Sequence, residues 1–177
     1  MVKRIVRNFN TAGLDYIFTG ALAASYYGTP RTTMDIDIVV KVTHDELRTK
    51  LVPALRKAEL RINEEKIDAA LKSEFRIATF EDSKSPFTVD IIFSTENLRK
   101  KVGSILGLPT FYQTPEDLIR VKLRMIKATV PKERALKDID DIRAILRFTE
   151  VDMKSLKRQA LKDSTFAILK DIANAAT

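Results

Sequence analysis

Two repeating patterns of apolar and polar residues run along the chain. In four segments apolar residues occupy every second position or nearly every position, as in strands with one or both faces buried. These predicted strands are residues 14–20, 34–40, 74–82 and 87–93, and the last two are expected to form a hairpin. Elsewhere apolar residues recur every three or four positions, which predicts helices in residues 2–11 and 21–28 and two helices within 44–73, the first kinked or interrupted at Pro53.

From Glu96 onward the pattern is mainly helical. A short helix is expected near residues 95–102, followed by an extended piece in 107–113 and three or four helices to the end. We therefore predict an α/β (α+β) fold with two parts. Residues 1–94 would form a small mixed sheet flanked by helices, and residues 95–177 a mainly helical C-terminal region that closes a cleft.

Two aspartates stand one residue apart inside the predicted strand 34–40. Aspartate is among the residues least favoured in strands, so the pair needs a reason. Because side chains alternate between the faces of a strand, Asp35 and Asp37 share one face and apolar residues take the other. The same alternation puts Asp90 on the face opposite the apolar residues of strand 87–93. If the strands are neighbours, three carboxylates gather on one polar face.

A cluster of three carboxylates is a candidate metal site. The mutual repulsion of Asp35, Asp37 and Asp90 would raise their pKa values unless a cation lay between them. Hard oxygen ligands suit Mg²⁺ or Mn²⁺, which commonly act as a pair of ions in phosphoryl transfer. The alternative is an ordinary amphipathic strand whose acidic face is solvated.

The segment before these aspartates offers a seat for a phosphate group. A predicted strand ends at Gly20 and a helix follows at once, so the backbone N–H groups at the helix start favour an anion. Gly20 permits the close approach that phosphate oxygens need. Gly20 and Ala21 are therefore candidate residues for binding a triphosphate.

In the second half, one lysine interrupts an apolar helix face. On a helical wheel of residues 116–127, Lys122 lies near the centre of the apolar arc. A buried ammonium is costly unless it is paired or its head reaches a polar cavity. Asp138 lies at the edge of the apolar arc of the next helix, so two interpretations stay open. Lys122 and Asp138 form a structural pair, or they belong to a site that opens onto the carboxylate cluster.

Composition narrows the alternatives. The chain of 177 residues has no cysteine and one histidine, His44, so neither a disulfide nor a zinc site built on thiolates or several histidines is expected. No segment resembles a signal peptide or a membrane span of roughly 18 apolar residues, which predicts a cytoplasmic protein without a membrane partner. Residues 1–94 hold 14 Lys and Arg against 13 Asp and Glu, whereas residues 95–177 hold 17 against 11. The basic second half suits a nucleic acid or polyphosphate partner, or is simply a solvated surface.

Several of these features together resemble a known fold. Gly20-Ala21, a short helix, the segment GTPRTTMDID and the later VDIIF look like the nucleotidyltransferase fold of the DNA polymerase beta superfamily. Its signature is a Gly followed by Ser or Gly, then Asp-x-Asp, then a third acid on a following strand. Ala21 departs from this pattern, so a hydroxyl contact to phosphate is lost although the backbone N–H remains.

A narrower resemblance is to the AbiEii-type branch, known from nucleotidyltransferase toxins of toxin–antitoxin systems. The Arg-x-Thr-x-Asp-x-Asp form runs from Arg31 to Asp37. A Lys on one helix and a Lys-Asp-x-x-Asp segment on the next are recurring motifs of that branch, and this chain has Lys122 and then Lys137-Asp138 with Asp141 three residues on.

The resemblance implies a metal-dependent enzyme that transfers NMP from an NTP to an acceptor hydroxyl on RNA, tRNA or protein, with Mg²⁺ or Mn²⁺ as cofactor and an antitoxin protein as a further partner. Its implied catalytic residues are Asp35, Asp37, Asp90, Lys122 and Asp138, of which Asp90 is the candidate to accept the acceptor's proton. Its implied nucleotide-binding residues are Gly20, Ala21, Arg31, Thr33 and Lys122.

Two other functions are compatible with the same residues. A binding module of this fold that has lost its chemistry could serve RNA or a partner protein, which Ala21 and the basic second half would both tolerate. A small-molecule enzyme of the aminoglycoside nucleotidyltransferase type would share the chemistry but not the acceptor.

Overall fold

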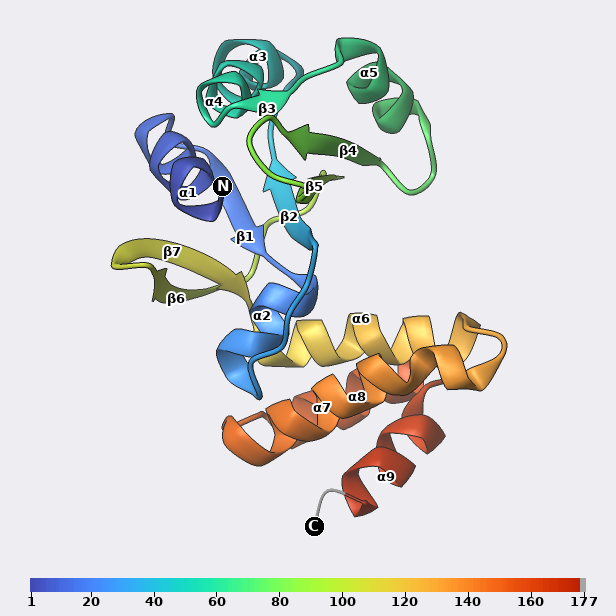
Figure 1. The fold of residues 1–177 in the computed structure, drawn as a ribbon. Helices are drawn as coiled ribbons and strands as arrows, with labels where there is room; N and C mark the ends of the chain where they lie inside the picture. The colour runs from blue at the N-terminus through green and yellow to red at the C-terminus, as the bar shows by residue number, and fades with distance from the viewer. Residues whose placement is uncertain (176–177) are drawn as a thin grey trace. The chain divides into compact units, whose positions relative to one another are not determined.

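The computed structural model describes residues 1–175, apart from the side chain of Lys132, and residues 176 and 177 of the predicted C-terminal region lie outside the described residues. The described chain forms two compact units (Figure 1). The sheet unit comprises residues 1–19 and 33–113. The helical unit comprises residues 20–32 together with the residues from Thr114 onward. The chain therefore enters the helical unit twice, after Thr19 and after Gln113.

The sheet unit is built on a seven-stranded mixed sheet with the strand order β3-β4-β5-β2-β1-β7-β6. Strands β2 and β5 pair in parallel, as do β1 and β7, and the other neighbours are antiparallel. The predicted hairpin of residues 74–93 is present as β4 and β5. The strands are β1 (Asp15–Phe18), β2 (Asp35–Lys41), β3 (Leu60–Arg61), β4 (Ile77–Asp82), β5 (Thr88–Ser94), β6 (Lys100–Ile105) and β7 (Leu108–Gln113).

Four helices belong to the same unit, namely α1 (Val2–Thr11), α3 (His44–Glu46), α4 (Val52–Lys57) and α5 (Glu64–Lys72). Helix α1 buries Ile5, Val6 and Phe9 and packs against α4 and β7. The predicted pair of helices within 44–73 is present, since α3 continues through a π-helical stretch (Leu47–Leu51) into α4, and α5 follows after β3. The π-helical stretch lies just before Pro53, where a regular helix would need an N–H that proline lacks.

The predicted short helix near residues 95–102 is wrong, because this segment leads into β6 of a hairpin with β7. Ile105 pairs with Leu108, so the loop holds two residues, Leu106 and Gly107. Their φ angles are 50° and 76°, as a two-residue hairpin turn with both central residues left-handed requires. Pairing with β7 outweighs the helix propensity of the Leu, Arg and Lys residues before the turn.

The helical unit contains α2 (Gly20–Tyr27), α6 (Pro115–Ala128), a 3₁₀ turn (Lys132–Ala135), α7 (Leu136–Phe148), α8 (Met153–Lys162) and α9 (Phe166–Asn174). Helix α2 packs against α7 and α6, far from it in sequence. Gly28, the residue after α2, lies against α7, where an added Cβ would lie 2.8 Å from the Ala144 Cβ. Glycine is therefore required there by space.

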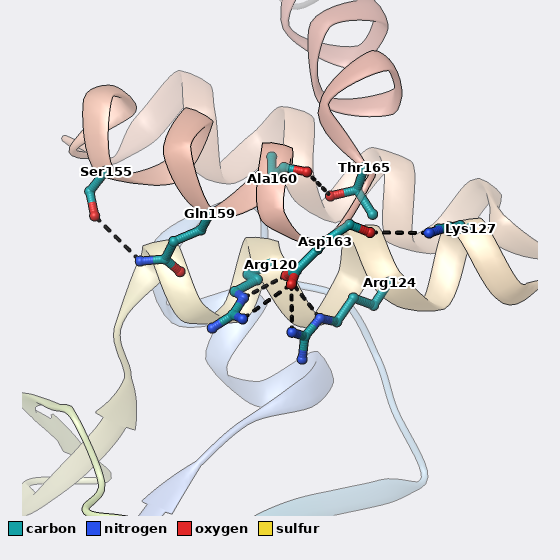
Figure 2. A network of polar contacts seen from close by, with 8 residues as sticks. All are labelled: Arg120, Arg124, Lys127, Ser155, Gln159, Ala160, Asp163 and Thr165. Atoms are coloured by element: carbon teal, nitrogen blue, oxygen red, sulfur yellow. Dashed lines mark hydrogen bonds and ion pairs between the residues drawn. The ribbon is translucent and has the colours of Figure 1, made fainter.

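A buried carboxylate ties α8 to α6 in this unit (Figure 2). Arg120 Nε and Arg124 Nε donate to Asp163 Oδ2 at 2.6 and 2.9 Å, and each arginine also donates to Oδ1. The Lys127 ammonium donates to the Asp163 carbonyl oxygen at 3.1 Å. The hydrogen bonds from Arg120 and Arg124 hold the pKa of the Asp163 carboxyl well below its ordinary value.

The predicted fold class is confirmed: a mixed sheet flanked by helices is accompanied by C-terminal helices. The closing of a cleft by residues 95–177 stays a prediction. Among the helices of the described chain, none is both long and apolar enough to cross a membrane.

Candidate active site

The three aspartates singled out above lie on neighbouring strands of the sheet unit. In the parallel register of β2 and β5, Asp37 is directly opposite Asp90, and Asp35 is opposite Thr88. Since paired residues project to the same side of a sheet, the three carboxylates share one face. Asp35 is exposed and the other two are half-buried. The opposite face of these strands is buried and holds Ile36, Ile38, Val89 and Ile91.

Two of these carboxylates are held by threonine hydroxyls on the adjacent strand. Thr88 Oγ1 donates to Asp35 Oδ1 at 2.6 Å, and Thr79 Oγ1 donates to Asp90 Oδ1 at 2.6 Å. Thr79 is directly opposite Asp90 in the pairing of β4 with β5. Each hydroxyl fixes the orientation of one carboxylate, so the acidic face is a bonded arrangement and not only a solvated surface.

The oxygen donors of this face suit a hard divalent cation such as Mg²⁺ or Mn²⁺. Within residues 1–175, no group of three or more His, Cys, Asp or Glu side chains is close enough together to hold a metal ion. In the rotamers described, Asp35 and Asp90 are instead engaged by threonines. The three aspartates fit a metal ion in that they offer carboxylate oxygens from one face of β2 and β5. Their role as metal ligands stays a prediction.

The start of α2, where a triphosphate is predicted to bind, has the backbone that the sequence suggested. Thr19, the last residue of the sheet unit before α2, donates its N–H to the Asp37 carbonyl at 3.0 Å. Gly20 then opens the helix with a φ of 57°, a conformation that favours glycine. Ala21 is buried, so its methyl group packs at the position where the signature that this segment resembles has Ser or Gly. Phosphate binding by Gly20 and Ala21 stays a prediction.

Lys122 is buried in the helical unit, with 4% of its surface exposed. Its ammonium lies 2.7 Å from Asp138 Oδ1 and 2.8 Å from Asp141 Oδ2. The pair with Asp138 that the helical wheel suggested is therefore present, and a second carboxylate joins it. The two carboxylates thus provide the partners that a buried ammonium requires.

Asp141 links this cluster to the predicted nucleotide-binding residue Arg31. Arg31 Nε and Nη2 donate to Asp141 Oδ1 and Oδ2 at 3.0 and 3.1 Å, which is a two-bond fork. Asp141 is itself buried. One network within the helical unit therefore joins two cations to two carboxylates, namely Arg31 and Lys122 to Asp138 and Asp141. Whether these groups contact a nucleotide stays a prediction.

Thr33, the other predicted nucleotide-binding residue, belongs to the sheet unit and contacts the backbone of Asp35. Its hydroxyl accepts from the Asp35 N–H at 3.2 Å and donates to the Asp35 carbonyl at 3.0 Å. This local turn positions the first residue of β2. A nucleotide contact by Thr33 stays a prediction.

Sequence reasoning did not assign three residues that the structure places in these networks. No motif in the sequence singles out Thr79 or Thr88, although Thr88 shares the polar face of Asp90 by simple alternation. Thr79 could be found from the hairpin register, which sets it opposite Asp90. Asp141 belonged to the Asp-x-x-Asp motif, but its partner Arg31 lies 110 residues away in sequence.

No protein-family model and no curated protein matches this sequence. Solved structures do match it over nearly the whole chain. The solution structure of the antibiotic-resistance factor ANT(2″)-Ia shares 16% identity and a TM-score of 0.63, over 98% of this chain and 91% of that one. The crystal structure of ANT(2″)-Ia in complex with adenylyl-2″-tobramycin gives 15% and 0.63, over 96% of each chain.

A third matching structure is that of a protein from Paracoccidioides brasiliensis. The antigenic nucleotidyltransferase-like protein from Paracoccidioides brasiliensis shares 16% identity and a TM-score of 0.64, over 97% of this chain and 88% of that one. At such identities the likeness establishes the fold and leaves the reaction to the residues of the site. The expected resemblance is therefore confirmed at the level of the fold: this chain has a nucleotidyltransferase fold.

Proposed function

We propose that this chain is a nucleotidyltransferase that moves NMP from an NTP to an acceptor hydroxyl, with Mg²⁺ or Mn²⁺ as its cofactor. The observation that carries the proposal is the pairing of Asp37 with Asp90 on adjacent parallel strands, next to Asp35, in a chain with this fold. Three acids side by side on the polar face of one strand pair repel one another, and a cation bound between them would offset this repulsion.

Asp35, Asp37 and Asp90 would hold the metal. When bound, a divalent cation supplies the positive charge that neutralises the triphosphate oxygens during in-line displacement. Asp90 would also accept the proton of the acceptor hydroxyl. The acceptor oxygen then forms a bond to the α-phosphorus, the bond from that phosphorus to the β-phosphate bridging oxygen breaks, and pyrophosphate leaves. Thr79 keeps the Asp90 carboxylate oriented for this transfer.

The positive and N–H groups of the helical unit would receive the triphosphate. Backbone N–H groups at the start of α2 (Gly20 and Ala21) offer an anion site. Lys122 would contact phosphate, with Asp138 holding its ammonium in place. Arg31 and Thr33 complete the predicted nucleotide contacts. Preorganised charges of this kind supply most of the catalysis in phosphoryl transfer, together with positioning.

The acceptor we propose is a hydroxyl on RNA, tRNA or protein, as the resemblance of residues 31–37 and of Lys122 with Asp138 to the AbiEii-type branch implies. A toxin-like role with an antitoxin partner belongs to the same hypothesis. The aminoglycoside type is a second candidate, which the likeness to ANT(2″)-Ia favours. The third is an inactive binding module, which the Ala21 departure favours.

Incubation with each of the four α-labelled NTPs and Mg²⁺ or Mn²⁺ tests the proposal. Total tRNA, a protein extract and tobramycin serve as separate acceptors. We expect the label to appear on one of them with the wild type, and the transfer to be lost with Asp37→Asn. Asp68→Asn is the matched control, because it makes the same change at an exposed acid on α5. Transfer that survives Asp37→Asn would contradict the proposed role of the acidic face, and metal-independent RNA binding without transfer would favour the inactive module.

A further inference from the structure

Helix α8 of the helical unit presents a row of positive charges to solvent. On a helical wheel its four exposed cations fall within one arc of about 140°, and the buried residues Leu156 and Ala160 lie on the other side. Among the described residues, none of the four cations has a carboxylate partner. We call this arc the cationic face, which consists of Lys154, Lys157, Arg158 and Lys162.

The positions of these cations are unfavourable for the helix itself. Lys154 lies in the first turn, where the helix dipole favours an acid. Lys154 and Arg158, and likewise Arg158 and Lys162, are like charges four residues apart, which destabilise a helix. Lys162 is the basic residue of the last turn, where a cation is favoured. Helix stability therefore does not explain the other three cations, whereas a negatively charged partner would offset their repulsion.

The two acids that flank α8 in sequence are already bonded. Asp152, the N-cap of α8, accepts at 2.9 Å from a backbone N–H of the first turn. Asp163, directly after the helix, accepts from Arg120 and Arg124 of α6 (Figure 2). These bonds also bring cations of α6 to the end of α8, because Arg124 is half exposed and the exposed Lys127 donates to the Asp163 carbonyl. The positive surface therefore continues from α8 onto the end of α6.

A polyanion with regularly spaced charges fits this face. Lys154, Arg158 and Lys162 follow one another at about 6 Å along the helix axis and span about 12 Å. Each strand of a duplex carries one phosphate about every 3.4 Å of its axis, so this length meets roughly three or four phosphates. Helix α8 contains no aromatic residue on which the bases of a single strand could stack. Leu161 is its large exposed apolar side chain, which is too little for insertion into a membrane surface.

We infer that the cationic face of α8 binds the phosphate backbone of a double-helical nucleic acid. Such contacts position a strand without reading its bases. Arg124 and Lys127 at the end of α6 extend the same surface. The binding itself is independent of any reaction, but the identification of the bound duplex as a stem of the RNA acceptor rests on the proposed function. In that case the face would hold the body of a folded RNA, and transfer would take place at a hydroxyl elsewhere on the same molecule.

The salt dependence of binding tests this inference. The probe is a fluorescently labelled RNA hairpin, followed by anisotropy at several salt concentrations in the absence of NTP. If each of the four cations neutralises one phosphate, a plot of log K against log salt has a slope of about −3.6 or steeper. The double variant Arg158→Gln with Lys162→Gln should make this slope shallower by about 2, which at 0.15 M salt corresponds to roughly 30-fold weaker binding. A slope that these substitutions leave unchanged would overturn the inference.

Lys66→Gln with Lys72→Gln is the matched control, because it removes the same two charges from exposed positions on α5. We expect this control to keep the wild-type slope. Both double variants lower the net charge of the chain equally, so equal weakening by the two would indicate a general charge effect and would overturn the inference. A thermal melt verifies that the variants are folded, and the removal of like charges four residues apart should not destabilise α8.

Two other ligands distinguish the possible partners. A DNA duplex of the same sequence is compared with the RNA hairpin: a preference for RNA indicates an RNA stem, and equal binding indicates that any duplex backbone is accepted. Vesicles that contain phosphatidylserine test a membrane surface. Binding to these vesicles without binding to either duplex would overturn the inference.

Turnover separates this inference from the proposed function. If label passes to tRNA, Arg158→Gln with Lys162→Gln should raise the KM for tRNA by a factor similar to the loss of binding and leave the KM for NTP unchanged. If label passes only to tobramycin, the identification of the duplex as the acceptor fails while the proposed transfer stands. If no acceptor takes label from any NTP, the proposed function fails, and the salt dependence of binding still decides whether α8 binds a nucleic acid.

Discussion

Replacing Lys122 with methionine removes one charge from the buried network of the helical unit and keeps most of the side-chain volume. Lys122 is 4% exposed, and its ammonium contacts Asp138 and Asp141. In Lys122→Met the apolar stem still packs among the buried residues of α6. The effect on stability therefore reports mainly the loss of charge pairing.

The two carboxylates that lose Lys122 keep different partners, and this difference sets the expected loss of stability. Asp141 keeps its two hydrogen bonds from Arg31. Asp138 loses its ammonium partner, but 18% of its side chain remains open to water. Breaking a buried ion pair by removing one partner costs about 3 to 5 kcal/mol. Because the carboxylates left here are partly compensated, we expect the lower end, about 3 kcal/mol. For a chain of this size, that corresponds to a fall in Tm of roughly 6 to 12 °C.

Urea denaturation followed by circular dichroism, together with a thermal melt, measures this loss. Lys137→Met is the matched control, because Lys137 is an exposed lysine on α7 and should change the free energy of unfolding by less than about 0.5 kcal/mol. The double variant Lys122→Met with Asp138→Asn should recover part of the loss, since the carboxylate that lost its ammonium is then neutral.

A Lys122→Met variant as stable as the wild type would refute this reasoning. If it also lost nucleotidyl transfer, the ammonium would serve catalysis without contributing to the fold. If stability fell and turnover per folded molecule were unchanged, Lys122 would be a structural partner of the two aspartates, and the proposed phosphate contact would be wrong.

Three further predictions concern other parts of the chain. Because the pKa of Asp163 is lower in the folded protein than its ordinary value of 3.8, its charge stabilises the fold above that pH. This contribution is lost as the pH falls below 3.8. Urea denaturation at a series of pH values should therefore show a fall in the free energy of unfolding, and the fall should be smaller in Asp163→Asn. Gly28→Ala should lower the free energy of unfolding by about 1 to 3 kcal/mol, because its Cβ would lie 2.8 Å from Ala144 Cβ; an unchanged urea midpoint would contradict the packing described. Thr79→Val should lower kcat, because the Asp90 carboxylate loses the hydroxyl donor that orients it, and Thr79→Ser should restore kcat.

The sequence alone could predict that the three aspartates lie on the polar faces of their strands. Alternation alone put Asp35 and Asp37 together and Asp90 on the polar side of its strand. It could not show that β2 and β5 are neighbours or that Asp37 is directly opposite Asp90, because strand pairing depends on contacts distant in sequence. The bond from Thr79 to Asp90 follows from the register of β4 and β5, which the hairpin prediction left open.

The helical unit shows a similar limit. The apolar arc around Lys122 left two interpretations open, a pair with Asp138 or a site that opens onto the carboxylates, and the structure contains the pair. The fork from Arg31 to Asp141 was out of reach, because no periodicity links a loop residue to a helix much later in the chain. The sequence does not reveal the hairpin around Leu106, because its turn is Leu-Gly, whereas Asn-Gly or Asp-Gly is the usual signal for a turn with two left-handed φ angles.

The discontinuity of the helical unit affects how the protein can be made. During synthesis α2 leaves the ribosome long before α6 and α7, the helices against which it packs. At typical elongation rates of about 5 to 20 residues per second, α2 waits for several seconds without its partners while the sheet strands emerge. The fork between Arg31 and Asp141 can close only after α7 has been synthesised. A nascent chain arrested before α7 would therefore hold the strands that carry all three aspartates but lack the packing of α7 against α2.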